Sequence, residues 1–194
     1  MTPSTPRADA RNNRTRIVEA ARDAIATAAP DGGDLRLNAI AKQAGVGQGT
    51  LYRHFPTRAD LLAEVYRHDV DELVALAPIL LKTEAPDDAL ALWFDRVADY
   101  ARVKRGVLAA VEASVWKDLS AHSLGPIGEA ITLLLESGRA SKVIRPEVDA
   151  QDVITLIGFL TRLDDSEWDD RARYLLTIVL DGLRPPTTVE ARRP

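Results

Sequence analysis

The chain has 194 residues, of which 46% are hydrophobic, 5% aromatic and 28% charged, as in an ordinary globular domain. It has no run of eighteen apolar residues that would predict a membrane-spanning helix, and its polar first residues lack the apolar stretch of a signal peptide, so we expect a cytoplasmic protein without a membrane partner. The absence of cysteine excludes disulfides, thiol nucleophiles and thiolate metal sites.

The net charge of −4 is unevenly distributed along the chain. Residues 1–58 hold nine Lys or Arg against five Asp or Glu, whereas the remainder holds sixteen against twenty-four. A cationic first third on an acidic body indicates that the first third meets a polyanion, although chance clustering is the alternative for a difference of this size.

Apolar residues recur at helical spacing from the start of the chain. A first helix is predicted over about 12–28, before the breaker residues 30–34, and a second over about 37–44, which Gly45 ends. A third contains Leu51 and Phe55 and ends at Pro56. Thr57 then forms a predicted N-cap, with Asp60 completing a capping box, for a fourth helix that runs to Pro78 or slightly beyond.

The same period continues to the end, without a repeat or a convincing strand. Five more helices are predicted: one after the break at 84–88, one from Gly106 to about Lys117, one from Pro126 to about Ser137, one that Asp149 caps and that ends near Leu163, and one that Ser166 caps and that ends at Gly182. The predicted fold class is therefore all-α, with about nine helices.

The two short helices on either side of Gly45-Val46-Gly47 have the layout of a helix-turn-helix. Gly45 suits the left-handed conformation that ends the first of them, and Leu51 and Phe55, four residues apart, place one stripe of the next helix against the core. This orientation turns Gln48, Gly49, Tyr52 and Arg53 outward and leaves Thr50 and His54 on the flanks. Such a helix, polar and narrow at its start, suits the major groove of DNA.

The residues IAKQAGV at 40–46 and GTLYRHFPTRADLL at 49–62 resemble the DNA-binding domain of the tetracycline-repressor (TetR) family. With the first helix, the resemblance extends from about Arg14 to Tyr66, and the remainder is similar to the family only in the number, length and order of its helices. The family cap before Leu37 is often Thr, but this chain has Arg36, which weakens the cap and adds a candidate phosphate contact.

The resemblance implies a set of DNA-binding residues. Gln48 corresponds to a position that contacts base edges, and its amide can pair with adenine. Gly49 lets the backbone approach the groove, and Arg58 corresponds to a phosphate-binding lysine. The full set of expected contacts is Gln48, Gly49, Thr50, Tyr52, Arg53, His54, Arg58, Asn38, Arg36 and Arg14.

The resemblance also implies four segments: a flexible arm at 1–10, a DNA-binding domain at 11–56, a ligand-binding and dimerisation domain at 57–184 and a flexible tail at 185–194. An effector pocket of unknown specificity is expected at Trp93, Phe94, Tyr100 and Trp116, although a Trp-Phe pair at helical spacing is more often plain core than part of a ligand site. The last two helices carry the expected homodimer face, comprising Val153, Leu156, Ile157, Leu160, Leu175 and Val179.

Catalytic chemistry is not predicted. The three histidines, His54, His68 and His122, lack metal-ligand spacing, and the glycines form neither a P-loop nor a dinucleotide fingerprint. We therefore expect no enzyme, no metal and no cofactor. The sequence predicts a homodimeric, ligand-responsive regulator, most simply a repressor, that binds double-stranded operator DNA. The alternative is an all-α module that binds a small molecule or a protein without binding DNA.

Overall fold

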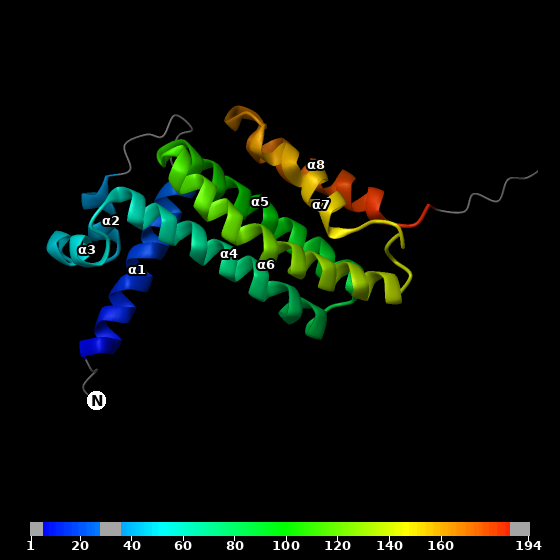
Figure 1. Ribbon diagram of the computed structural model, residues 1–194, viewed down its shortest axis with the longest axis horizontal. Coiled ribbons are helices and arrows are strands. Elements are labelled where there is room, and N and C mark those ends of the chain that lie inside the picture. Colours follow the sequence, from blue (N-terminus) through cyan, green and yellow to red (C-terminus); the bar gives the residue numbers. More distant parts are fainter. Residues whose placement is uncertain (1–5, 28–35, 187–194) are drawn as a thin grey trace, which may run out of the picture. The chain divides into compact units, whose positions relative to one another are not determined.

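The computed structural model describes residues 6–27 and 36–186, and over these two ranges the chain is all-α, as predicted. Its elements in chain order are α1 (Pro6–Thr27), α2 (Leu37–Gln43), α3 (Gln48–His54), α4 (Arg58–Thr83), α5 (Pro86–Ala110), α6 (Ala113–Ala140), α7 (Ala150–Ile157), the 3-10 turns η1 (Gly158–Thr161) and η2 (Asp165–Glu167), and α8 (Trp168–Leu183) (Figure 1).

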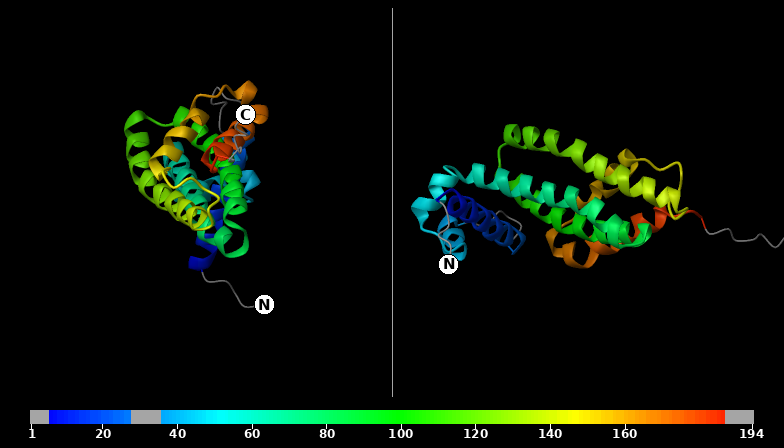
Figure 2. Two further views of the ribbon diagram at one scale, coloured as in Figure 1. Left: turned by 90° about the vertical axis from the view of Figure 1, so that its right-hand side faces the viewer. Right: turned by 90° about the horizontal axis from the view of Figure 1, so that it is seen from below.

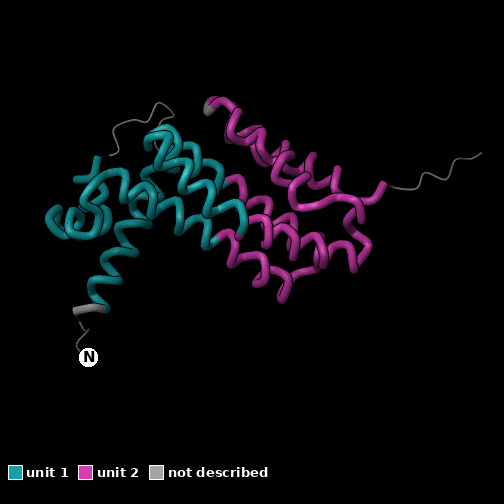
Figure 3. The backbone as a smooth tube through the Cα atoms, in the orientation of Figure 1, with its two compact units in different colours: residues 1–72, 99–125 teal, residues 73–98, 126–194 magenta. Residues whose placement is uncertain are grey.

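The chain divides into two compact units (Figure 3). Unit 1 comprises residues 1–72 and 99–125, and unit 2 comprises residues 73–98 and 126–194. The long helices α4, α5 and α6 each contribute one segment to each unit. Within unit 1, therefore, the three N-terminal helices share a core with parts of the bundle helices.

In unit 1, α2 and α3 contact each other and both contact α1 (Figure 1). Ile17 and Ala21 of α1, Ile40 of α2 and Leu51 of α3 are almost completely buried, as the three-and-four spacing predicts. The start of α4 adds Leu61 to this core. The predicted capping box forms at that start: Thr57 N–H donates to Asp60 Oδ2 at 3.0 Å, and Asp60 N–H donates to Thr57 Oγ1 at 3.1 Å.

In unit 2, α8 lies beside the first part of α5, where Arg173 Nε is 2.6 Å from Asp95 Oδ1, and α7 contacts α8 (Figure 2). The core contains Trp93, whose indole N–H donates to the carbonyl of Leu73 at 2.9 Å, and Trp168 of α8. The predicted cap of α7 also forms, since Asp149 and Asp152 make a complete capping box.

Two predicted helix boundaries are wrong. Gly106 does not open a helix but lies inside α5, where a Cβ atom would come within 2.5 Å of Ile25 Cγ2. The glycine is therefore required by close packing between helices and not by a turn. Pro126 does not open a helix either, because α6 continues through it and tolerates the loss of one backbone hydrogen bond. The described residues consequently form eight α-helices instead of about nine.

Other predicted helix ends differ in the structure. α1 begins at Pro6, earlier than the predicted start near residue 12, whereas α4 ends at Thr83, a little beyond Pro78 as predicted. At the other end of the chain, α7 stops at Ile157 and the 3-10 turn η1 follows it. Ser166 is not the cap of α8, because that helix follows Glu167, which makes no side-chain cap hydrogen bond.

Candidate nucleic-acid interface

The turn between α2 and α3 is closed by backbone geometry that only glycine adopts readily. Gly45 has φ +62°, its N–H donates to the carbonyl of Lys42 at 3.1 Å, and the N–H of Val46 donates to the carbonyl of Ala41 at 2.9 Å. These two hydrogen bonds form a Schellman motif, which ends α2 and sets the direction in which the chain enters α3. The position of α3 therefore depends on Gly45.

One face of α3 is anchored in unit 1. Leu51 and Phe55 are each 1% exposed. The guanidinium carbon of Arg14 lies 4.6 Å from the centroid of the Phe55 ring, so α1 also covers the end of α3. With this stripe buried, the opposite face of α3 has to point to solvent.

The solvent face of α3 presents the residues expected from the sequence. Gln48, Gly49 and Arg53 are exposed, and Tyr52 is 46% exposed. A Cβ atom at Gly49 would meet no other atom within 4 Å, so the surface beside the α3 backbone is open. Thr50 and His54 are half-buried on the flanks, as predicted from their helical positions. An exposed amide, phenol and guanidinium on one narrow helix match the donors and acceptors of a major groove.

Arg58 stands at the N-terminus of α4, directly after the capping-box residue Thr57. Its Nε atom is buried and makes no hydrogen bond within the described ranges. A guanidinium at the positive end of a helix dipole is suited to an anion such as a DNA phosphate. Asn38 and Arg36 are exposed on and beside α2, and Arg36 makes no side-chain cap hydrogen bond there, in line with the weakened cap expected from the sequence.

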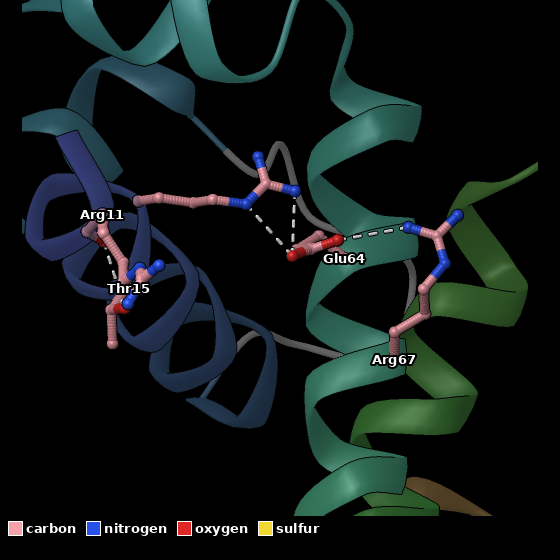
Figure 4. Close-up of polar contacts among 5 residues, drawn as sticks. Arg11, Thr15, Glu64 and Arg67 are labelled. Atoms are coloured by element: carbon pink, nitrogen blue, oxygen red, sulfur yellow. Dashed lines mark hydrogen bonds and ion pairs between the residues drawn. The ribbon is translucent and has the colours of Figure 1, made fainter. Parts of the chain in front are cut away.

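Arg14 differs from the other predicted contacts, because intramolecular partners already engage its side chain. Its Nη2 atom lies 2.9 Å from Glu64 Oε1 of α4, and Glu64 Oε2 accepts a hydrogen bond from Arg67 at 3.2 Å (Figure 4). Glu64 therefore lies between a cation of α1 and a cation of its own helix. The sequence does not reveal this ion pair, since the two partners are 50 residues apart.

A second tie between α1 and α4 is more deeply buried. Arg22 Nε lies 2.6 Å from Oδ1 of Asp69, whose side chain is completely buried. A sequence signal exists for this pair: Asp69 follows Leu62 and Tyr66 at helical spacing and thus occupies an apolar stripe of α4. A charge at such a position indicates a partner from another helix.

The four aromatic residues expected in an effector pocket belong to different units. Trp93 and Phe94 lie in the core of unit 2, with their ring centroids 6.1 Å apart. Tyr100 and Trp116 lie in unit 1, and each contacts the ring of Tyr66, with centroids 6.0 and 5.3 Å apart. Burial, followed by the proximity of Tyr66, raises the pKa of Tyr100 far above its ordinary value, so its phenol is neutral and can donate a hydrogen bond.

The residues expected in a dimer face divide by burial within unit 2. Val153 and Leu160 are buried in the core of this unit, Ile157, Leu175 and Val179 are half-buried, and Leu156 is 48% exposed. Two exposed apolar residues of α8 were not expected, Tyr174 at 62% and Ile178 at 49%. They lie four residues apart, a spacing that places both on one face of the helix.

A metal site and a membrane-spanning helix are both missing from the parts of the chain that the structure describes. No group of three or more His, Asp or Glu side chains there could hold a metal ion. Among these residues, no helix is both long and apolar enough to cross a membrane.

Comparison with known proteins relates both the N-terminal and the C-terminal part of the chain to transcriptional regulators. The family profile for bacterial regulatory proteins of the tetR family matches residues 17–65, and the profile for the C-terminal domain of SbtR-like transcriptional regulators matches residues 85–185. An HTH-type transcriptional regulator of Staphylococcus aureus (strain USA300) is 42% identical over 65 residues, which are 34% of each chain. The chain thus matches only about a third of the length of that relative.

Similarity to solved structures extends over nearly the whole chain. A TetR transcriptional regulator from Streptomyces coelicolor is 36% identical with a TM-score of 0.78, over 90% of this chain and 99% of that one. A TetR transcription regulatory protein from Mycobacterium vanbaalenii is 29% identical with a TM-score of 0.69, over 93% of this chain and 100% of that one. This family and fold are those of regulators and not of enzymes. With a DNA-binding helix-turn-helix at α2 and α3 and an SbtR-like helical domain after it, the chain belongs to the TetR family of transcriptional regulators.

Proposed function

We propose that this protein is a ligand-responsive repressor that binds a palindromic operator as a homodimer in the cytoplasm. The observation that carries the proposal is the orientation of α3: its apolar stripe is buried at Leu51 and Phe55, while Gln48, Gly49 and Tyr52 are exposed together. In a dimer, two such helices enter successive major grooves about 34–36 Å apart, which requires a half-site repeat of about one helical turn.

The exposed apolar side chains of unit 2 support the proposal that two copies of the chain form a homodimer. Leu156 of α7 and Tyr174 and Ile178 of α8 belong to helices that contact each other. Burying apolar side chains of this size stabilises an association by roughly 25 cal/mol per Å². A face built from both helices would pair with the same face of another copy around a twofold axis.

Release from DNA would follow from a ligand that favours a different conformation. Thermodynamic linkage requires that the effector bind the form that does not bind DNA more tightly than the form that does. The helix suited to couple the two events is α4, because Arg58 at its start lies beside the DNA-reading surface and Tyr66, two turns later, lies in the aromatic cluster of unit 1.

The proposal is tested by selecting binding sites for the full chain from a library of random duplex DNA at two salt concentrations. We expect a palindrome to be enriched and the affinity to fall steeply as salt rises, because bound phosphates release counterions. The variant Tyr52→Ala should lose affinity while its circular dichroism is unchanged, whereas Lys117→Ala, which removes an exposed cation of α6, should bind as the wild type does. Failure of a folded dimer to enrich any sequence would favour a helical module that does not bind DNA.

A further inference from the structure

Lys104 occupies a position in α5 where an apolar residue is expected. It follows the buried Tyr100 by four residues and precedes the buried Val107 by three, so these three side chains belong to one stripe of the helix. Lysine is among the residues that are least often found at such positions without a partner. This otherwise apolar face of α5 therefore carries a charged residue at a position where an apolar side chain would pack equally well.

The contacts of Lys104 are aromatic and not ionic. Its Nζ atom lies 5.9 Å from the ring centroid of Tyr100 and 5.5 Å from that of Trp116. Within the described ranges, no carboxylate lies at ion-pair distance from this ammonium group. Burial lowers the pKa of Lys104, which is the direction expected for a cation that has lost water without gaining an anion.

The neighbouring hydroxyl groups of Tyr66, Tyr100 and Ser123 all donate their protons to acceptors within the protein. Ser123 Oγ donates to the carbonyl of Ser120 at 3.0 Å, so the 2.7 Å contact between Tyr66 and Ser123 has the Tyr66 hydroxyl as donor. The 3.0 Å contact between the phenols then has Tyr100 as donor to Tyr66. All three hydroxyl protons are therefore used in hydrogen bonds within the protein. The ammonium group of Lys104, which lies against the Tyr100 ring, remains as a donor for a ligand.

Among the described residues of unit 1, the buried carboxylate of Asp69 has a cationic partner, unlike the half-buried Lys104. Asp69 lies on the apolar stripe of α4, and Arg22 binds its carboxylate at 2.6 Å. Lys104 has no equivalent counter-ion among the described residues. A half-buried cation against aromatic rings, without its own carboxylate, matches a ligand that brings the negative charge and a flat apolar body.

We propose that Lys104 is an effector-binding residue and that the effector is an aromatic organic acid, whose carboxylate pairs with the Lys104 ammonium and whose ring lies against Trp116 and Tyr100. This inference rests on the proposed function, in which a small molecule controls DNA binding. It specifies the charge class of the ligand and the side chain that selects it.

Calorimetric titration of the full chain tests the assignment without DNA. The probes are benzoate, 1-naphthoate and anthracene-9-carboxylate, each measured beside its own carboxamide, which has the same size and no charge. We expect the wild type to bind at least one of the acids roughly tenfold more tightly than the matching amide, as one charge-assisted contact would give. Lys104→Met should abolish that preference, and Lys104→Arg should retain it.

Lys117→Met is the matched control, because Lys117 is an exposed lysine of α6 in the same unit. It should keep the wild-type preference, and thermal melts should show that every variant is folded. Equal binding of acid and amide at all three sizes, no binding of any acid, or a preference that survives Lys104→Met would overturn the proposal. Because no DNA is present, these outcomes are separate from those of the operator selection, which alone decides whether the protein binds DNA.

Discussion

Arg22 of α1 and Asp69 of α4 form a short ion pair, with 2.6 Å between Nε and Oδ1, although 47 residues separate them. The Asp69 side chain is completely buried, whereas that of Arg22 is 29% exposed. This pair joins the helix that packs on α3 to the helix that carries Tyr66 of the aromatic cluster. Of the ion pairs between α1 and α4 among the described residues, it is the more deeply buried.

Removing one partner of this pair should destabilise the protein more than removing both. We expect Arg22→Met to lower the free energy of unfolding by about 3 kcal/mol, because the variant leaves the Asp69 carboxylate buried without its cation. The double variant Arg22→Met with Asp69→Leu should recover most of that loss. Urea unfolding followed by circular dichroism measures all three free energies. A double variant that is no more stable than Arg22→Met would contradict the pairing.

The left-handed backbone at Gly45 predicts a second stability effect. Gly45→Ala should lower the free energy of unfolding by about 1–2 kcal/mol, since φ is +62° and an alanine Cβ is strained in this conformation. Gly49→Ala is the control, because Gly49 lies inside α3 without a positive φ and a Cβ atom there would meet nothing within 4 Å. Equal thermal midpoints for the two variants would mean that the turn does not depend on this conformation.

Gln48 and Arg58 should affect DNA binding in different ways. Gln48 is exposed on α3, so Gln48→Ala should relax the preference at one base pair of each half-site at a cost of about 1–3 kcal/mol. Arg58 lies at the start of α4, so Arg58→Ala should weaken binding to all sequences alike and reduce the salt slope by about 1. Affinity measurements at several salt concentrations, on the selected site and on its single-base variants, separate these effects. If both variants changed only the salt slope, Gln48 would not read a base.

Lys104 predicts a pH-dependent stability with a defined sign. Burial lowers its pKa in the folded chain below the ordinary value of 10.5, so the charged form costs stability at neutral pH. This cost is fully present below the folded pKa and disappears as the pH rises through it towards 10.5. Tyr100, whose pKa burial raises, stays neutral over this range.

Lys104→Met should therefore be more stable than the wild type at pH 7, and the difference should shrink as the pH approaches about 10. Urea unfolding at both pH values measures it, with Lys117→Met as the exposed control. A difference that grows with pH would contradict a lowered pKa for Lys104.

Local patterns in the sequence were sufficient to predict much of the helix-turn-helix at α2 and α3 and several helix caps. The spacing of Leu51 and Phe55 predicts which face of α3 is buried, and Gly45 predicts the turn before it. The capping box of Thr57 and Asp60 and the cap at Asp149 are equally local. These features depend on residues within one helical turn of each other, so their physical causes are visible in a short stretch of sequence.

The three-dimensional packing decided the features that depend on distant residues. Gly106 has the appearance of a helix break but fits against Ile25 of α1, and Arg14 has the appearance of a free cation but pairs with Glu64. Helical periodicity shows that a face is apolar without showing which helix covers it. For the same reason, the sequence alone determined that this chain carries a polar reading helix, and only the tertiary structure decided that Asp69 has a counter-ion in Arg22 while Lys104 meets aromatic rings.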